Sequence, residues 1–196
     1  SKLKYLPPQA RSPALLVLDL EQNLFQSHAL QKLPRGLTIL NLVGNPLLDM
    51  KLPMLPHLRS LSLDNCGLTS FEGFPQFQQL RFLSVSNNRI TNFKGLPILM
   101  KLEYFNIDNN PFKFGSKLSI AAIGSISLNM FNDVELSESD LEDAFKLSPL
   151  VGFSLRCGRD PTPCESPEEE VRKSQNFLTS KLASYLKSKQ IENPTL

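Results

Sequence analysis

The stretch that decides the fold is LRFLSVSNNRI, residues 80–90. It fits the phrase L-x-x-L-x-L-x-x-N-x-L, with valine and isoleucine in two of the leucine positions. The phrase occurs five times, and its copies begin at Leu15, Leu37, Leu58, Leu80 and Leu102. Neighbouring copies therefore start 21 or 22 residues apart. A fixed period of this length indicates a chain built from stacked, similar units.

Each copy contains a short strand with one apolar face. Positions four and six of the phrase are apolar in every copy, as in Leu61 and Leu63, whereas position five is always Asp, Asn or Ser. Because alternate residues of a strand point to opposite faces, positions four and six predict a buried face. One unit cannot bury this face alone, so neighbours stack around a shared core. We therefore expect an α/β solenoid with a parallel sheet.

Position nine of the phrase holds a polar residue at a sharp turn. It is asparagine at positions 23, 45, 88 and 110, and cysteine at Cys66. A chain that leaves a strand and turns sharply leaves backbone groups without partners, and a buried carboxamide can satisfy them with two donors and an acceptor. We expect these asparagines to be structural, and Cys66 to be a small buried residue rather than a reactive thiol.

The phrase resembles the leucine-rich repeat, and the resemblance covers residues 15–112. Apolar residues recur with a spacing of three after Leu68 and Ile90, which favours short helical or 3₁₀ segments. This second half is similar to the 22-residue intracellular class typified by the nuclear regulator of protein phosphatase 1. The resemblance implies a curved parallel sheet with a concave face, short helical or 3₁₀ segments on the convex side and a helical C-terminal cap.

The chain divides into three regions at the sequence level. We expect an N-terminal cap over 1–14, the repeats and a first cap helix over 15–149, and an irregular last rung, a loop and a C-terminal helix over 150–196. A helix is expected over 116–127, and Ser137 is the expected N-cap of the next one. Leu150, Phe153 and Leu155 repeat the strand phrase, which predicts a last irregular strand there.

A strong helix start lies at Ser166 and Pro167, where an N-cap serine is followed by proline and glutamates. The helix should run to about Lys189, with Val171 and Leu178 on its apolar face. The simpler interpretation is a terminal cap that folds back over the last rungs. A detachable helix that binds a partner, or a coiled-coil seam, is the alternative.

The tail after the repeats has a second resemblance. The run from Phe131 to Asp133, then Leu155 and Arg156, and the segment 164–178 are similar to the tail of the microtubule-associated proteins first named as auxin-induced in root cultures. The resemblance implies that the chain is a fragment of a larger cytoskeletal protein. It also implies tubulin or microtubules as the partner, and a cytoplasmic, cytoskeletal location.

Composition narrows the function classes. The chain has 196 residues, 41% of them hydrophobic, with a net charge of +2 and scattered basic residues, which is not typical of a nucleic-acid-binding surface. The longest apolar runs are too short to cross a bilayer. An odd count of three cysteines favours a reducing compartment. We expect a cytoplasmic monomer with no nucleic-acid or membrane partner.

The expected binding site lies on the concave face, where side chains point away from the core. An aromatic and arginine cluster should lie near one edge of the sheet, and two aspartates should form an acidic stripe beside it. The cluster consists of Arg59, Arg81, Phe82 and Tyr104, and the stripe of Asp64 and Asp108. Aromatic residues and arginine are typical of interface hot spots. The sequence therefore predicts a noncatalytic scaffold that binds another protein.

Two other functions stay open. One is a regulatory subunit of a protein phosphatase, which would need charged and aromatic residues across many rungs of the concave face. The other is redox or metal chemistry at the loop that carries Cys157 and Cys164, although no third ligand completes a metal site there. His28 and His57 lie far from any nucleophile in the register, so we expect no catalysis, no cofactor and no small-molecule substrate.

Overall fold

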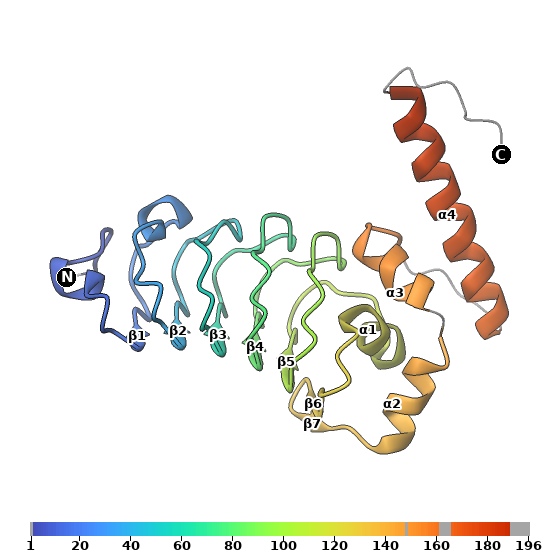
Figure 1. Ribbon diagram of the computed structural model, residues 1–196, viewed down its shortest axis with the longest axis horizontal. Coiled ribbons are helices and arrows are strands. Elements are labelled where there is room, and N and C mark those ends of the chain that lie inside the picture. The colour runs from blue at the N-terminus through green and yellow to red at the C-terminus, as the bar shows by residue number, and fades with distance from the viewer. Residues whose placement is uncertain (1, 148, 161–165, 189–196) are drawn as a thin grey trace.

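Within the residues that the computed structural model describes, 2–147, 149–160 and 166–188, seven short strands form one open sheet in chain order (Figure 1). The strands are β1 Val17–Asp19, β2 Ile39–Asn41, β3 Ser60–Ser62, β4 Phe82–Ser84, β5 Tyr104–Asn106, β6 Met130–Phe131 and β7 Val134–Glu135. β1 to β6 pair in parallel, and β7 runs antiparallel to β6. The helices follow the first five strands, so the chain has an α/β arrangement.

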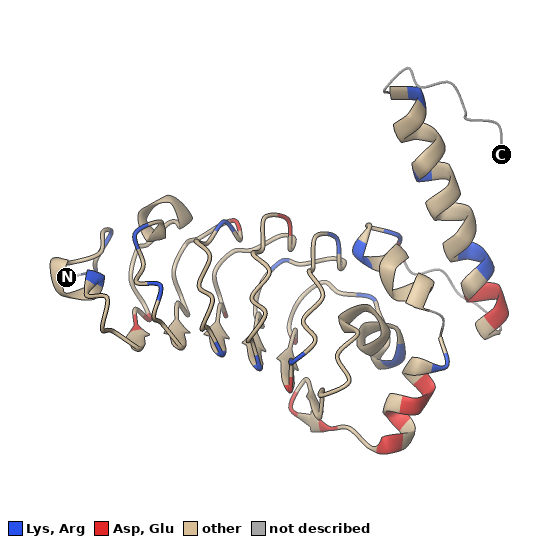
Figure 2. Cartoon of the chain, in the orientation of Figure 1, with Lys and Arg blue, Asp and Glu red and all other residues tan. Residues whose placement is uncertain are grey.

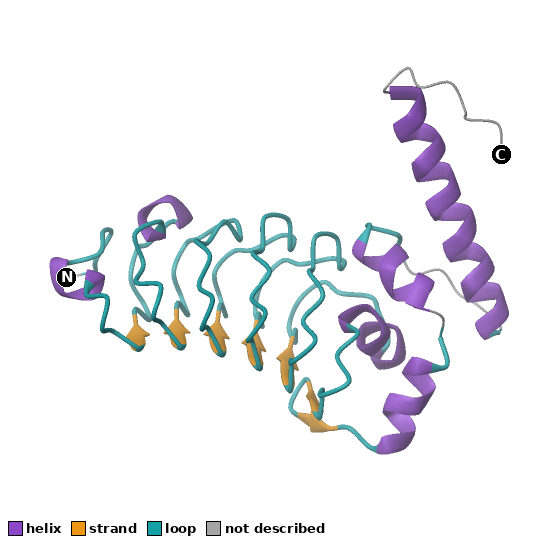
Figure 3. Cartoon of the chain, viewed as in Figure 1, coloured by secondary structure: helices purple, strands orange, loops and turns teal. Residues whose placement is uncertain are grey.

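The register of the parallel strands aligns equivalent positions of the sequence phrase. Leu40 pairs with Leu61, Leu61 with Leu83, and Leu83 with Phe105. All four side chains are buried, and Leu63 is fully buried as well. The predicted parallel sheet and its buried face are therefore confirmed. The chain returns from each strand to the next on one side of the sheet, as Figure 3 shows.

The core is one continuous cluster that runs from the N-terminal segment to the helices. Phenylalanines fill its centre, and the ring of Phe71 lies 6.3 Å from the rings of both Phe93 and Phe105. Leu6 closes the core at the N-terminal end and Leu155 at the other. Each unit therefore shares its apolar side with its neighbours, which is how a sheet of three-residue strands becomes stable.

The asparagines of position nine bridge adjacent units. The side-chain oxygen of Asn88 accepts hydrogen bonds from the backbone N–H groups of Cys66 at 2.9 Å and Leu68 at 3.0 Å. Its amide nitrogen donates to three backbone carbonyls of the same two units. The asparagines at 23, 45 and 110 bond backbone groups in a similar way. Their predicted structural role is confirmed.

The connecting segments contain less helix than expected. The structure has the 3₁₀ helices η1 Pro8–Arg11 and η2 Ser27–Leu30 in its described part, and neither lies after β3 or β4. In the segment after β4, the N–H of Leu96 donates to the carbonyl of Phe93 at 3.0 Å, which makes a single turn. Gly95 within it has a φ of +87°. Such a left-handed residue ends the turn, so no 3₁₀ helix propagates there.

Four helices in the described residues complete the chain, namely α1 Ser116–Ile123, α2 Glu138–Phe145, α3 Pro149–Arg156 and α4 Pro167–Ser188. α1 confirms the helix expected over 116–127 but ends earlier, because Gly124 adopts a φ of +67° as its C-cap. Ser137 is the N-cap of α2, as predicted, and forms a capping box with Asp140.

The strand expected at Leu150, Phe153 and Leu155 is absent from the described residues, because α3 occupies this segment. Val151 and Leu155 are buried four residues apart, whereas Phe153 is about half exposed. This spacing is helical, and α3 packs on α1. Gly152 permits the close contact, since a Cβ atom there would lie 2.3 Å from the carbonyl oxygen of Ala121.

We expected α4 to fold back over the last rungs of the sheet, and it does not. Its bounds match the prediction closely, but only its first turns pack on α3, and the rest extends away from the body (Figure 1). Polar groups hold the packed part. Arg159 and Glu170 form a buried ion pair, and the hydroxyl groups of Ser154 and Ser174 lie 3.1 Å apart beside it. We call these four residues the polar latch.

Candidate functional site

The outer sheet face is the face that the strands turn away from the core. We define it by the first and third residues of β1 to β5, whose middle residues are buried. The first residues align in one row across the sheet, and this row consists of Val17, Ile39, Ser60, Phe82 and Tyr104. Val17 and Ile39 are 55% and 43% exposed. The outer sheet face therefore presents an apolar and aromatic row to solvent.

Phe82 and Tyr104 form a stacked aromatic pair within this row. Their ring centres are 4.2 Å apart and their planes differ by 9°. The Tyr104 hydroxyl donates to Oδ1 of Asp133 at 2.5 Å, and Nδ2 of Asn106 donates to Oδ2 of the same carboxylate at 3.0 Å. Burial, and then the hydrogen bond to Asp133, raise the pKa of Tyr104 above its usual value. The phenol therefore stays neutral at physiological pH and holds its ring in place.

Arg59 and Arg81 lie next to the aromatic pair on the backbone ladder. The N–H of Arg81 donates to the carbonyl of Arg59 at 2.8 Å, so the two residues are neighbours on adjacent units. Nη1 of Arg81 lies 2.6 Å from Oε1 of Glu103 in an exposed salt bridge, which stabilises by at most about 1 kcal/mol. Arg59 is exposed and has no ion pair among the described residues. The structure thus brings together the predicted cluster of Arg59, Arg81, Phe82 and Tyr104.

The two residues of the expected acidic stripe are both half-buried, and the carboxylate of Asp64 accepts hydrogen bonds. Oδ1 of Asp64 accepts from the hydroxyl of Ser84 at 2.6 Å and from the N–H of Ser86 at 2.7 Å. Its carboxylate therefore binds the end of β4 and the turn after it, and Asp64 is only partly accessible. Asp108 is also half-buried, and its backbone N–H donates to the Asn106 side chain at 2.9 Å.

Asp133 is the residue in contact with this cluster that the sequence analysis did not predict. It lies with Asn132 in the two-residue turn between β6 and β7, and both residues have positive φ, 51° and 60°. This is the pattern of a type I′ turn, which favours Asn and Asp. A turn-prone Asn-Asp pair between apolar residues was the available signal. It turns the chain back so that the carboxylate meets Tyr104.

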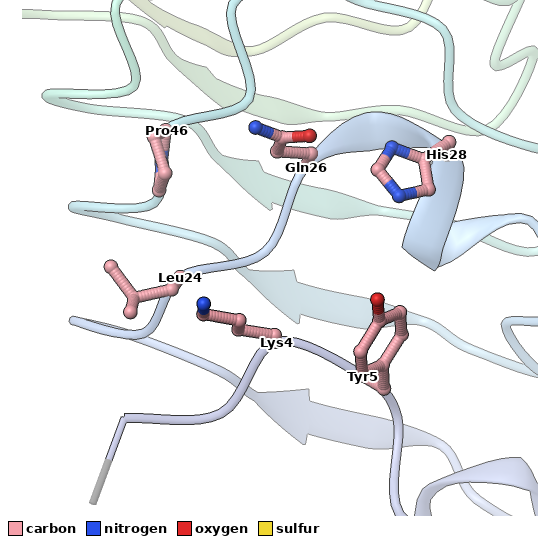
Figure 4. Close-up of a pocket in the computed structure, with 6 residues that line it drawn as sticks. All are labelled: Lys4, Tyr5, Leu24, Gln26, His28 and Pro46. Carbon is pink, nitrogen blue, oxygen red and sulfur yellow. The ribbon is translucent and has the colours of Figure 1, made fainter.

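A separate hollow lies at the N-terminal end, on the returning segments. It has a volume of about 380 Å³ and is lined by Lys4, Tyr5, Leu24, Gln26, His28 and Pro46 (Figure 4). The lining holds no carboxylate and no thiol.

The cysteines do not form a shared redox or metal site in the described residues. Cys66 is fully buried, as predicted, and its Sγ donates to the carbonyl of Leu42 at 3.2 Å. Burial raises the pKa of the Cys66 thiol to about 12, so the thiolate is not accessible at neutral pH. Cys157 is half-buried, and Cys164 lies outside the described residues. No group of three metal-ligating side chains occurs within residues 2–147, 149–160 and 166–188.

None of the helices that the structure describes has the length and apolar character to span a bilayer.

Searches against known proteins give no family for this chain. No family model matches the sequence. The curated proteins also contain no significant match.

Proposed function

We propose that this chain is a leucine-rich repeat protein that acts without catalysis, as a scaffold that binds another protein on the concave face of a solenoid. The proposal is supported by parallel strands in chain order, by a core shared between units and by asparagines that bridge neighbouring turns. In this proposal the outer sheet face is the concave, partner-binding face.

The observation that carries the proposal is the stacked pair of Phe82 and Tyr104 on that face. Asp133 and Asn106 hold Tyr104, so its ring loses little freedom when a partner binds. A surface that is ordered in advance binds at a lower entropic cost. Aromatic side chains beside arginines are the residue types that dominate interface energetics. Together with Arg59, the pair offers a partner a flat apolar contact and a positive charge.

Tubulin or microtubules are the first partner to test. The support is the similarity of the tail to the microtubule-associated proteins described above, which also makes the cytoplasm the proposed location. The aromatic pair and Arg59 supply the proposed contact. Cosedimentation of the chain with assembled microtubules tests the partner, and a pull-down from cell extract tests for any other protein.

The variant that tests the face is Arg59→Glu with Phe82→Ala. Arg59 is the better arginine to change, because Glu at position 81 would also repel Glu103. We expect at least a tenfold loss of affinity, about 1.4 kcal/mol, with cooperative unfolding retained. Met54→Ala is the control, since Met54 is 56% exposed on a returning segment. Equal binding by the double variant and the wild type would reject the face, and absence of cosedimentation would reject microtubules.

A further inference from the structure

The distal half of α4, residues 177–188, leaves the body of the protein with apolar side chains in solvent. Leu182 is 59% exposed and Tyr185 is 56% exposed. They belong to one stripe on the helix, the α4 stripe, which consists of Leu178, Lys181, Leu182 and Tyr185. Removing such apolar side chains from water is favourable. The α4 stripe therefore has the properties of a contact surface.

α2 carries a stripe with the same spacing and the opposite charge. The α2 stripe consists of Glu138, Leu141, Glu142 and Phe145, at the same i, i+3, i+4, i+7 positions as the α4 stripe. Phe145 is 43% exposed. A hollow of about 500 Å³ is lined by this stripe together with Lys146. Neither Glu138 nor Glu142 has an ion pair among the described residues.

Charge selects between the surfaces that the α4 stripe could meet. The distal half of α4 carries Lys181 and Lys187 and no acidic residue, whereas α2 is predominantly acidic (Figure 2). Two α4 stripes packed together would bring their Lys181 side chains close to one another, which is unfavourable. An apolar surface with acidic neighbours is complementary, and the α2 stripe is such a surface.

The α2 stripe of the same molecule is out of reach. The polar latch fixes the first half of α4 on α3, and the distal half extends away from α2 (Figure 1). We propose that the α4 stripe of one copy of this chain packs on the α2 stripe of a second copy, with Lys181 near Glu138 and Glu142. The contact joins two different surfaces, so it is heterologous and links copies head to tail.

Sedimentation equilibrium of the 196-residue chain tests the proposal. We expect the mean mass to exceed that of the 22.0 kDa monomer at protein concentrations below about 1 mM. A dissociation constant of about 1 mM corresponds to a binding free energy of about −4 kcal/mol. A mass that stays at 22.0 kDa up to about 1 mM overturns the proposal. Leu182→Glu and Phe145→Glu should each weaken the association at least tenfold. Ser180→Glu, on the opposite side of α4, is the control and should leave it unchanged.

Mixing the two defective variants identifies the contact. The Leu182→Glu chain keeps its α2 stripe, and the Phe145→Glu chain keeps its α4 stripe. A heterologous contact therefore predicts that the mixture forms a one-to-one dimer although neither variant associates alone. Circular dichroism should show that both variants keep the helix content of the wild type. A mixture that stays monomeric, or a Phe145→Glu chain that associates like the wild type, refutes the pairing of these stripes.

Discussion

The ion pair between Arg159 and Glu170 should hold α4 in place, and Glu170→Ala tests this. The two side chains are only 6% and 5% exposed, so water cannot replace the lost carboxylate while α4 stays docked. Removing one partner of a buried pair typically destabilises by about 3–5 kcal/mol, because the other charge stays buried. Nε of Arg159 keeps its 3.0 Å bond to the hydroxyl of Ser154, which places the expected value near the lower end.

The variant can avoid most of this penalty by releasing α4. Since the contacts of α4 with other helices and strands in the described residues are mainly with α3, its detachment exposes the Arg159 guanidinium to water without unfolding the sheet. We therefore expect Glu170→Ala to lose protection against hydrogen exchange at residues 167–178. The protection of β3 and β4 should stay that of the wild type. The variant follows the route that costs less. Its protecting free energy at α4 therefore falls either by the cost of the unpaired Arg159 charge or by the free energy that docks α4 on α3, whichever is smaller.

Glu169→Ala is the matched control, because it removes the same group one residue earlier. Glu169 pairs with Lys173 on the helix surface at 3.0 Å, an interaction of about 0.2–0.5 kcal/mol. Arg159→Leu combined with Glu170→Leu should restore much of the protection, since an apolar pair removes the buried charge altogether. Equal exchange at α4 in Glu170→Ala and Glu169→Ala would refute the reasoning.

Two further predictions concern position nine of the sequence phrase. Asn88→Ala leaves the buried N–H groups of Cys66 and Leu68 without acceptors. The free energy of unfolding, measured by chemical denaturation, should therefore fall by about 2–6 kcal/mol. A fall of less than about 1 kcal/mol would contradict the bridging role. The pKa of Cys66 rises from 9.0 to about 12 on folding, so the stability it contributes is complete below pH 9 and is lost as the pH rises toward 12. Denaturation midpoints over this range should fall more steeply for the wild type than for Cys66→Ala, and parallel profiles would rule this out.

The part of the fold that depends on periodicity could be predicted from the sequence. The phrase marks the buried residues of each strand, because alternation in a strand leaves only one register that buries Leu61 and Leu83. It also placed Arg81 beside Phe82 and Tyr104, since equal positions of neighbouring units become neighbours in space. The candidate site is thus predictable as far as it consists of residues from successive units.

Features that depend on single contacts outside the phrase were not predictable. Phe153 and Leu155 fit a strand pattern, whereas Val151 and Leu155 fit a helical one, and contact with α1 through Gly152 decides for the helix. The polar latch gives no hydrophobic signal, because Glu170 is expected on a surface and is buried only by its pairing with Arg159. The apolar pattern of α4 shows which face of the helix can be buried. It does not show whether another element of the fold covers that face.

Cys66 shows how one unit accommodates a break in the asparagine column. Asn45 accepts from the N–H of Phe25 in the preceding unit, and an acceptor at position 66 would serve Leu47 in the same way. A thiol is only a weak acceptor, so the N–H of Leu47 donates instead to the carbonyl of Asn45 at 2.8 Å. The Cys66 thiol still donates to the carbonyl of Leu42, so the donor half of the bridge between the two units is kept. Position nine therefore needs a side-chain donor at each turn, whereas a backbone carbonyl can replace the side-chain acceptor.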